Sequence, residues 1–496
     1  MMCVFDKGDT RMGIIRISAR ALLAITVISA SVLAAGFENT GVGIQAQAMG
    51  GAFRGVANDW TATYYNPAGL AYMTDNQWGV ESAFLHFRDE LTPDYRYGGL
   101  DTVTGFYNGL AIYNQHAVLT NPTGGIVGKL PILGETVWGL SIYQPFDQNI
   151  NWNLYQPPRA YNDSLSAPGQ QYGVNLDVVA FQFTAAREIK PGKMSLGLGI
   201  QLLRADLVYR DLKFRSTPMT TSPYTDVPYS HIPEFLYSDG NGWGLGLRAG
   251  MMYKLNEKAN LGVTAALPFN ITVKGDARLD FLMPMIKSTR NKQTDPNSVE
   301  YLFASGRNVS LSRAFETKLK LPASFGVGLS YKVTEKFLVA LDGEYTLWST
   351  FDGFDFALAS GDGLSGAAAD PSVSSFFTSD VSTVVDWRNT IKAALGGRYN
   401  VSPALTVLAG LSVDQGVDPN KVGFTPQFVD TGTKLGFNGG LQLHLQTWDL
   451  GLGGTIISNP DLTVDRTYES DGSLLGFPGL YKATTFETIL SIARRF

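Results

Sequence analysis

Cysteine and histidine are scarce in this sequence. Cys3 is the single cysteine among 496 residues, which excludes an intramolecular disulfide framework. The four histidines, His86, His116, His231 and His444, are scattered and show no metal-ligand spacing. We therefore expect no metal site and no cofactor. The formal net charge of −5 also gives no reason to expect a nucleic-acid partner.

Long apolar runs are absent outside the N-terminus. No later segment approaches the roughly 18 consecutive apolar residues of a transmembrane helix, which excludes a helical membrane protein. The one apolar run, 21–34, follows Arg11, Arg16 and Arg20 and ends in small residues. This pattern predicts a cleaved secretory signal peptide over residues 1–34. An uncleaved anchor is the alternative, although the run is short for a span.

The true start of translation has three candidates, Met1, Met2 and Met12. The acidic residues ahead of Met12 are unusual in a signal peptide, which favours Met12. Cys3 precedes the apolar run, so it is not a lipid-anchor cysteine. We expect the mature chain to begin near Ala35.

Glycine and aromatic residues are abundant. The chain contains 54 Gly, 28 Phe, 22 Tyr and 8 Trp, a combination that favours many strands and turns over long helices. Strict alternation recurs, as in 434–446, where leucines and a phenylalanine share one face and Asn438, Gln442, His444 and Gln446 share the other. Such strands are apolar on one side only.

The joins between the expected strands alternate in length. Several joins are a few residues long, whereas the ones between them run to dozens of polar and aromatic residues. Short turns at one end, long loops at the other and an even strand count predict an all-β, 14-stranded antiparallel transmembrane β-barrel of the bacterial outer membrane, with its long loops outside the cell. A soluble β-sandwich also alternates but has no reason to separate its loops by length. We predict strands at 76–88, 122–132, 136–147, 173–189, 193–209, 242–255, 259–276, 316–333, 336–349, 387–401, 404–415, 433–446, 448–458 and 484–496.

The mature N-terminus, "AGFENTGVGIQAQAMGGAFRGVANDWTATYYNPAGLA", resembles the N-terminal hatch of the FadL/OmpP1/TodX family of outer-membrane transporters. The resemblance continues in order along the chain and implies a fourteen-stranded barrel plugged by an N-terminal hatch. It also implies transport of long-chain fatty acids and other hydrophobic compounds. The expected domains are a signal peptide at 1–34, a hatch at 35–75 and a transmembrane barrel at 76–496. The further matching segments are 138–146, 241–263, 319–351 and 386–414.

The turn formed by Asn66, Pro67, Ala68 and Gly69 has the chemistry of a rigid closure. Pro67 fixes φ and removes a donor, Asn66 can bond nearby backbone groups, and Gly69 permits a tight exit. By resemblance this turn belongs to the hatch that blocks the pore. The plainer interpretation is a turn that leads into the first strand, and the two are compatible.

Two predicted external loops, 147–172 and 210–241, carry more aromatic residues than a solvated loop needs. By resemblance they form a groove that captures the substrate. An aromatic girdle or loop self-packing is the alternative. The substrate-capture candidates are Trp152, Tyr155, Tyr161, Phe235 and Tyr237.

A carboxylate headgroup inside the lumen would need a cation. The alternation of the strands places five candidates on inward faces, although each could instead pair with other lumen charges or with the hatch. The headgroup candidates are Arg248, Lys318, Lys320, Lys392 and Arg398.

No enzymatic motif stands out, and we expect a transporter and not an enzyme. The expected partners are hydrophobic small molecules and outer-membrane lipid, and the expected state is a monomer. Uptake of aromatic hydrocarbons, which needs no cation, and service as a secretion or attachment platform are the alternative functions.

Overall fold

A computed structural model describes most of the chain beyond the predicted signal peptide. The predicted signal 1–34 and the capture candidate Tyr161 lie outside the described residues. The described residues are 35–94, 109–114, 118–129, 135–155, 168–226, 229–290, 295–359, 363–378, 381–417, 425–430, 432–465, 467–468, 474–475 and 478–496.

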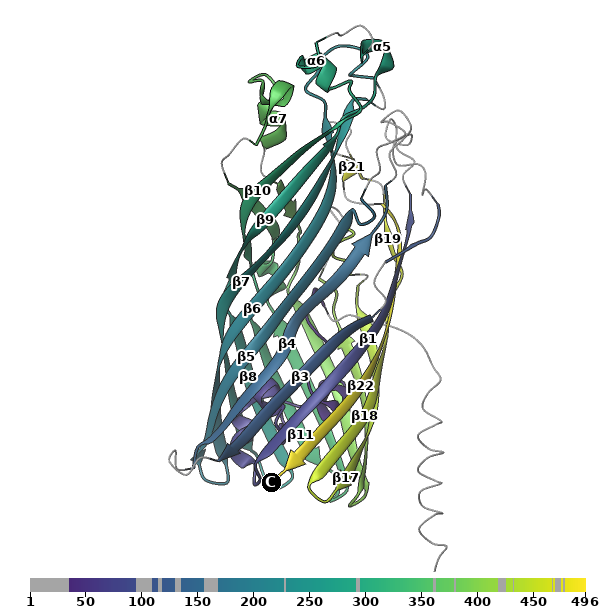
Figure 1. Ribbon diagram of the computed structural model, residues 1–496. Coiled ribbons are helices and arrows are strands. Elements are labelled where there is room, and N and C mark those ends of the chain that lie inside the picture. Colours follow the sequence, from purple (N-terminus) through teal and green to yellow (C-terminus); the bar gives the residue numbers. More distant parts are fainter. Residues whose placement is uncertain are drawn as a thin grey trace, which may run out of the picture.

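Fourteen antiparallel strands close into a barrel, as the sequence predicts (Figure 1). The first and last strands pair along 77–93 and 479–495, which completes the ring. In order around the wall, the strands are β1 (Gln77–Pro93), β3 (Val118–Lys129), β4 (Val137–Trp152), β5 (Tyr172–Lys190), β6 (Met194–Ser216), β7 (His231–Lys254), β8 (Ala259–Pro268) continued by β9 (Ile271–Leu282), β11 (Ser324–Lys332) continued by β10 (Asn308–Leu319), β12 (Phe337–Thr346), β15 (Thr390–Ser402), β16 (Leu405–Asp414), β17 (Lys434–Leu445), β18 (Trp448–Ser458) and β22 (Gly479–Arg495).

The remaining elements are short. The described part of the chain contains no helix with the length and hydrophobicity to cross a membrane. The short strands are β2 (Ile112–Tyr113), β13 (Gly353–Leu358), β14 (Val381–Val384), β19 (Leu462–Val464), β20 (Thr467–Tyr468) and β21 (Leu474–Leu475). The helices are α2 (Ile44–Ala48), α3 (Ala62–Tyr65), η1 (Pro67–Tyr72), α5 (Lys287–Arg290), α6 (Val299–Leu302), η5 (Trp348–Thr350), η6 (Gly366–Ala369) and α7 (Ser374–Thr378).

The two ends of the barrel differ as expected. At the short-turn end, where the C-terminus also lies, β5 meets β6 within 190–194 and β17 meets β18 within 445–448 (Figure 1). At the long-loop end the strands run further than predicted, since β6 continues to Ser216 and β7 already begins at His231. The prediction of one loop over 210–241 was therefore wrong. Its aromatic residues belong largely to paired strands, because cross-strand pairing satisfies their backbone.

The outer and inner faces of the wall have opposite character. Large apolar side chains such as Leu245, Phe325 and Phe437 are exposed on the outside, as lipid contact requires. Polar side chains such as Gln182 and Thr264 are buried on the inside. The strands are therefore apolar toward lipid and polar toward the lumen.

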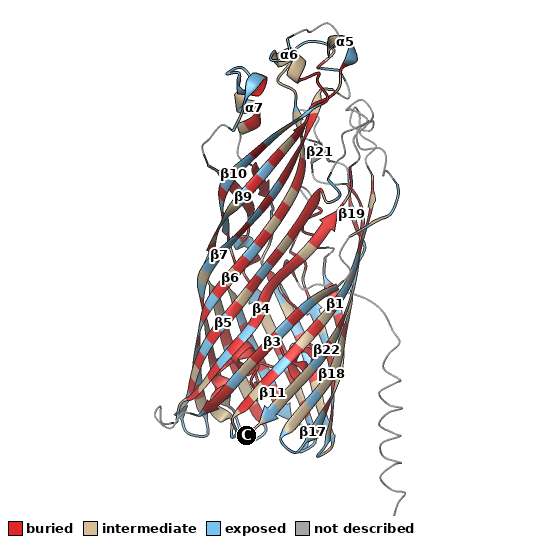
Figure 2. Cartoon of the chain, in the orientation of Figure 1, coloured by how far each residue is buried: buried red, intermediate tan, exposed pale blue. Residues whose placement is uncertain are grey.

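The N-terminal segment 35–75, here termed the hatch, lies inside the barrel toward the short-turn end (Figure 1). Almost all of it from Ala35 to Leu70 is buried, and it forms much of the red interior of Figure 2. Its η1 turn packs against β5, β6 and β7, whereas α2 packs against β16, β17 and β18. The hatch thus touches opposite arcs of the wall.

Four neighbouring strands are interrupted between their lower and upper halves, at 269–270, 320–323, 347–352 and 385–389. The interruption at 320–323, which includes Pro322, reverses the alternation. Leu319 is fully buried above it, while Phe325 is exposed below it. Lys318 is consequently exposed, so the predicted inward orientation of Lys318 was wrong. Simple alternation fails wherever a strand is broken.

Candidate functional site

The Asn66 turn is fixed by hydrogen bonds to both the hatch and the wall. The Asn66 side chain accepts from Ala68 N at 3.2 Å and donates to the carbonyls of Arg54 at 2.9 Å and Met251 at 3.2 Å. The hydroxyl of Ser195 donates to Ala68 O at 2.8 Å. These bonds satisfy buried polar groups that water cannot reach, so the turn has one stable position.

Glycines in the wall make room for the hatch. A Cβ on Gly250 would lie 2.2 Å from Asn66 Oδ1, and one on Gly197 would lie 2.3 Å from the Pro67 carbonyl carbon. Within the turn, a Cβ on Gly69 would lie 2.1 Å from Ala57 O. No larger residue fits at such distances. Wall glycines facing other hatch residues in the same way are Gly79, Gly125, Gly262, Gly326, Gly328, Gly396, Gly410 and Gly453.

A buried cation joins the middle of the hatch to the wall. Arg54 pairs with Glu344 at 2.5 Å and with Asp342 at 3.4 Å, and its Nε donates to Thr264 at 3.1 Å. Asp342 also accepts the backbone N–H of Arg54 at 2.9 Å. Burial alone would lower the pKa of Arg54, but the two carboxylates outweigh burial and raise it, so the guanidinium is permanently charged.

The first turn of the hatch lies across the seam between β1 and β22. Glu81 of β1 accepts the Gly43 N–H and the Gln47 side-chain amide, both at 2.8 Å. Glu487 of β22 accepts the Thr40 hydroxyl at 2.6 Å. One short stretch of hatch therefore binds both the first and the last strand of the barrel.

The N-terminal end of the hatch is enclosed by aromatic rings. Phe37 is fully buried, and five rings surround it with centroids between 4.8 and 6.4 Å away. Trp348, Phe351 and Trp387 come from the strand interruptions at 347–352 and 385–389. The breaks in the wall thus supply the inward-pointing rings. We term this set the Phe37 cage: Phe146, Trp348, Phe351, Trp387 and Phe428.

Strand β4 is irregular where the hatch meets it. The β4–β5 register shifts between Tyr143 and Phe146, which leaves Pro145 outside the ladder. The hatch uses this site, because Asn39 N donates to Pro145 O at 3.0 Å and Asp147 N donates to Phe37 O at 2.9 Å. Hatch residues 37–39 are therefore hydrogen-bonded through their backbone to the inner side of β4 at this irregularity.

Two of the predicted headgroup cations lie beside acceptors in the lumen. Arg248 donates to Tyr64 O at 2.5 Å and lies 4.4 Å from the Tyr64 ring centroid. Lys392 lines a small cavity of about 20 Å³ together with Glu38 and Glu344. These contacts match the alternative of pairing with the hatch or with other lumen charges. Lys320 instead pairs with the exposed Asp352 at 2.5 Å and lies between two buried leucines, so its predicted inward orientation was wrong.

The other two candidates lie apart from these. Lys318 is exposed on the outside of the wall. Arg398 lines a separate and larger cavity at the short-turn end. The structure therefore does not bring the five cations together into one headgroup site.

The predicted capture residues gather near the long-loop end. Trp152 and Tyr155 are buried, the Trp152 indole donates to Pro426 O at 2.8 Å, and the Tyr155 ring lies 6.1 Å from Phe235. Tyr237 is exposed, with the Arg210 guanidinium 5.2 Å from its ring centroid. A cavity of about 570 Å³, here termed the mouth pocket, is lined among others by Phe235, Leu236, Tyr237 and Arg210.

The Phe37 cage and Arg54 were missed by the sequence reasoning. The cage residues come from four distant places in the chain, so no local pattern connects them. One usable signal was present, because Trp348 lies near the end of the predicted strand 336–349 and Trp387 begins the predicted strand 387–401, where an inward bend was possible.

Comparisons with known proteins agree with this architecture. A family model described as "Outer membrane protein transport protein (OMPP1/FadL/TodX)" matches residues 25–422. The chain belongs to this family. It is therefore a transport protein of the outer membrane.

Individual relatives are distant. An outer membrane protein of Neisseria meningitidis serogroup B is 24% identical over 439 residues, which cover 86% of each chain. A FadL homologue of Pseudomonas aeruginosa superposes with a TM-score of 0.70 at 17% identity, over 93% of this chain and 100% of the homologue. The toluene transporter TodX of P. putida gives 0.65 at 15% identity, over 92% and 99%. At such identities the likeness establishes the fold alone.

Proposed function

We propose that this protein takes up hydrophobic compounds across the outer membrane, with its long loops outside the cell. The observation that carries the proposal is the Phe37 cage. An ordinary aqueous pore has a polar lumen, whereas these six rings form an apolar cluster inside the barrel that suits an apolar ligand. Membership of a transport family and the neighbouring FadL and TodX folds support the same function.

The proposed route begins at the mouth pocket. Its apolar residues Phe235 and Leu236 accept the hydrocarbon part of a ligand, and Arg210 lies beside them. Each methylene transferred there from water contributes about 0.8 kcal/mol. The mouth pocket is thus a capture site that needs no movement of the hatch.

The second stage is the Phe37 cage. Phe37 occupies the place of an apolar ligand, since its ring contacts are replaceable by any ring or chain of similar size. We propose that an arriving ligand displaces the Phe37 ring and thereby loosens the N-terminal end of the hatch. The Asn66 turn, which is fixed by backbone hydrogen bonds, stays seated during this step.

Long-chain fatty acids are the first substrate candidate. Their chain suits the apolar mouth pocket and cage, and their carboxylate suits Arg210, whose NH1 otherwise donates to Asn151 at 2.9 Å. Aromatic hydrocarbons are the second candidate, favoured because every cage residue is aromatic and because the relatives include a toluene transporter.

Uptake by proteoliposomes tests the function and separates the substrates. Three proteins are reconstituted into liposomes: the wild type, Arg210→Gln and Trp348→Ala. Uptake of oleate and uptake of toluene are measured for each. Loss of oleate uptake alone in Arg210→Gln identifies the fatty acid, because a charge-assisted hydrogen bond is worth about 1.5–3 kcal/mol. Equal effects on both ligands identify the aromatic hydrocarbon.

The matched control is Phe269→Ala, which removes a ring of similar size from the exposed outer face. It should leave uptake unchanged, whereas Trp348→Ala should reduce uptake of both ligands. Wild-type protein that moves neither ligand faster than empty vesicles contradicts the transport proposal and favours an attachment platform.

A further inference from the structure

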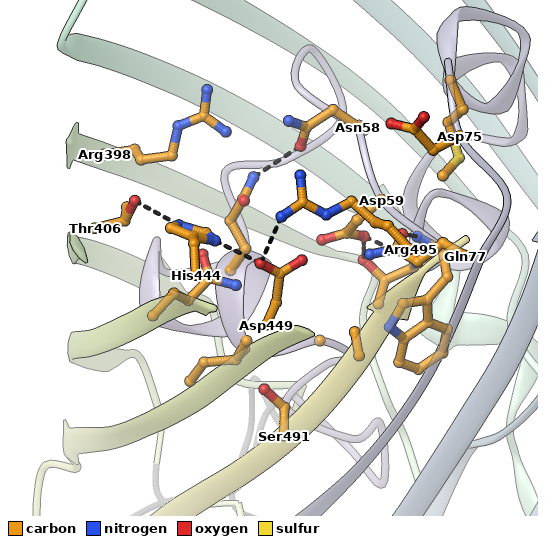
Figure 3. Close-up of a pocket in the computed structure, with 18 of the residues that line it drawn as sticks. Asn58, Asp59, Asp75, Gln77, Arg398, Thr406, His444, Asp449, Ser491 and Arg495 are labelled. Carbon is orange, nitrogen blue, oxygen red and sulfur yellow. Dashed lines mark hydrogen bonds and ion pairs between the residues drawn. The ribbon is translucent and has the colours of Figure 1, made fainter. Parts of the chain in front are cut away.

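A second cavity lies beneath the hatch at the short-turn end (Figure 3). Its volume is about 380 Å³. The roof comes from hatch residues around Asn58–Thr61 and Met73–Asp75, and the walls come from β15, β16, β17, β18 and β22. On this arc α2 packs against β16, β17 and β18, and the cavity remains between the hatch and the short-turn end of these strands. We term this space the lower cavity.

Two of the basic side chains in the lower cavity, His444 and Arg495, are already engaged by Asp449. The carboxylate of Asp449 contacts His444 Nδ1 at 2.6 Å and Arg495 at 3.1 Å. The other ring nitrogen of His444 lies 2.9 Å from the Thr406 hydroxyl. These four residues form a closed network on one wall of the cavity, as Figure 3 shows.

The hatch carboxylates around the cavity, and Glu81 of β1, are also engaged. Asp59 accepts the backbone N–H and the hydroxyl of Thr61 at 2.9 and 2.5 Å. Asp75 accepts the hydroxyl of Thr74 at 3.0 Å. Glu81 is bound by the hatch backbone at Gly43. Their local bonds leave the centre of the cavity without a committed anion.

Arg398 is the exception among these charges. Within the described part of the chain its side chain makes no hydrogen bond and no ion pair, although the charge of Asp59 lies close enough to act on it. Its guanidinium extends into the cavity toward Asn58 (Figure 3). The Asn58 carbonyl oxygen already accepts from Gln45 at 2.8 Å, so its amide nitrogen remains as a donor. A guanidinium fork beside an amide donor is the usual receptor for a carboxylate.

Apolar residues complete the site. Ile44, Trp60 and Met73 also line the lower cavity and offer a surface to a few methylenes next to the headgroup. A phosphate is a poorer fit, since a second negative charge would lie near Asp59 and Asp449. The cavity therefore combines one free cation with an apolar side.

We propose that the lower cavity binds the carboxylate of an amphiphilic acid, with Arg398 and Asn58 holding the headgroup. The choice of ligand rests on the proposed function, because a transported fatty acid has to release its headgroup toward the short-turn end. The site itself is defined by Arg398 and is accessible to a carboxylate from either source, the transported acid or a small acid from the periplasm.

Calorimetric titration of the purified protein with octanoate tests the site. Arg398→Gln should weaken octanoate binding about tenfold or more, in line with the loss of a charge-assisted pair. Octanol, which has no charge, should bind both proteins equally. Arg494→Gln is the matched control, since Arg494 lies at the same end but is exposed on the outer face. Equal octanoate affinity in wild type and Arg398→Gln overturns the proposal.

Competition with acetate distinguishes the two sources. Acetate that competes with octanoate at similar concentration identifies small periplasmic acids, and a requirement for the alkyl chain identifies the transported amphiphile. Both results support a carboxylate site. The titration needs no transport, so a protein that binds octanoate through Arg398 but fails the vesicle assay refutes only the proposed function.

An independent observation concerns the start of the hatch. Ala35 N donates to Asp414 Oδ2 at 2.9 Å, and the two residues are 1% and 7% exposed. Gly36 has φ +60°, and a Cβ there would lie 2.8 Å from the Trp348 ring, so this position requires glycine. Phe37 fills the cage. The first three hatch residues are thus fitted individually to the lumen.

The charges around Asp414 are unbalanced. Among the described residues, five carboxyl groups face three basic side chains in this part of the lumen. Even with Glu38 protonated the acids exceed the bases by one, and one positive charge at Ala35 N would remove this excess. An α-ammonium carries that charge and also offers more donors than an amide. The acids are Glu38, Asp342, Glu344, Asp414 and Asp430, and the bases are Arg54, Lys392 and Lys434.

We infer that signal cleavage before Ala35 creates an α-ammonium that pairs with Asp414, so that processing completes the seat of the hatch. Mass spectrometry of the purified protein should find Ala35 as the first residue. Its amine should react slowly with an amine-selective reagent in wild type and at least several-fold faster in Asp414→Asn.

Two outcomes contradict this inference. One is a mature chain that starts elsewhere, and the other is an Ala35 amine that reacts at the same rate in wild type and Asp414→Asn. Ser412→Ala, a neighbouring substitution in β16, controls for general loosening of the wall.

Discussion

The two ends of the hatch are held by different physics. The Asn66 turn is fixed by directional hydrogen bonds and by wall glycines that admit it at backbone distance. The Ala35–Phe37 end is held mainly by ring contacts, with two polar contacts to the wall from Ala35 N to Asp414 and from Asp147 N to Phe37 O. Ring contacts are non-directional and can be replaced by a ligand, whereas the buried backbone bonds of the turn cannot be given up without leaving unsatisfied groups. The same short segment therefore combines a fixed end with an exchangeable end.

Removing both ends at once has the largest expected effect. Deletion of 37–70 should leave a folded barrel, because its backbone bonds run between strands and not to the hatch. The lumen exposed in this way is polar, so single-channel conductance in planar bilayers should rise from near zero to a porin-like value. If the barrel that lacks 37–70 stays heat-resistant on gels and yet conducts no ions, the hatch is not the plug.

The fixed end can be displaced alone. Gly250→Val places a side chain where Asn66 Oδ1 now lies, so the Asn66 turn should leave its seat and conductance should become intermittent. Gly343→Val is the matched control, since a Cβ at Gly343 meets nothing within 4 Å. Closed channels in both variants would mean that the turn is not needed to seal the lumen.

The exchangeable end gives a smaller effect. Phe37→Ala removes a fully buried ring, which costs about 3–5 kcal/mol of local packing, yet it also vacates the cage. The proposed displacement by ligand predicts that an apolar probe binds this variant more tightly than wild type, measured by quenching of tryptophan fluorescence. Asn66→Ala should not increase probe affinity. Tighter binding in Asn66→Ala but not in Phe37→Ala reverses the assignment of the two ends.

The smallest expected effect is a pH dependence of the N-terminal end. Burial first, and then Glu344, raise the pKa of Glu38 from 4.5 to about 8, with Asp414 also raising it and Lys392 and Arg54 lowering it. A raised pKa means that the seated hatch favours the protonated acid. Its contribution is complete below about pH 4.5 and is lost as the pH rises through 8.

Channel noise in bilayers should therefore increase between pH 5 and about 8 and then level off, by at most about tenfold per pH unit in the open-state population. Glu38→Gln should abolish the dependence. A dependence of the same size in Glu38→Gln assigns the titration to another group.

Periodicity and loop lengths were sufficient to predict the barrel. Each of the fourteen predicted strands overlaps an observed one, because lipid on one side and a polar lumen on the other impose strict alternation. The upper ends of β6 and β7 were missed, since their alternation continues through aromatic residues that are also common in loops. The predicted orientation of the Lys318 side chain was wrong because it assumed unbroken alternation, whereas the strand is interrupted at 320–323.

The site was predicted less well than the fold. Alternation predicted that Arg248, Lys392 and Arg398 face inward, and these three residues line cavities within the barrel, while their headgroup role stays a prediction. The Phe37 cage could not be predicted, because it depends on which of many rings the strand interruptions turn inward. The abundance of glycine was visible in the sequence, but the glycines that face the hatch could not be identified. For most of them the hatch residue that they contact lies more than a hundred residues away in the chain.

The contacts of Thr40 and Gly43 with Glu487 and Glu81 bear on how the molecule is assembled. The chain's earliest and latest strands meet only at the final closure of the ring, and the same few hatch residues bond to both. A ring that closed before these residues had entered would enclose two carboxyl groups without their hatch partners and leave the hatch outside a sealed wall. Insertion into the membrane is therefore expected to proceed around an already folded N-terminus, which acts as an internal template for the last pairing of strands.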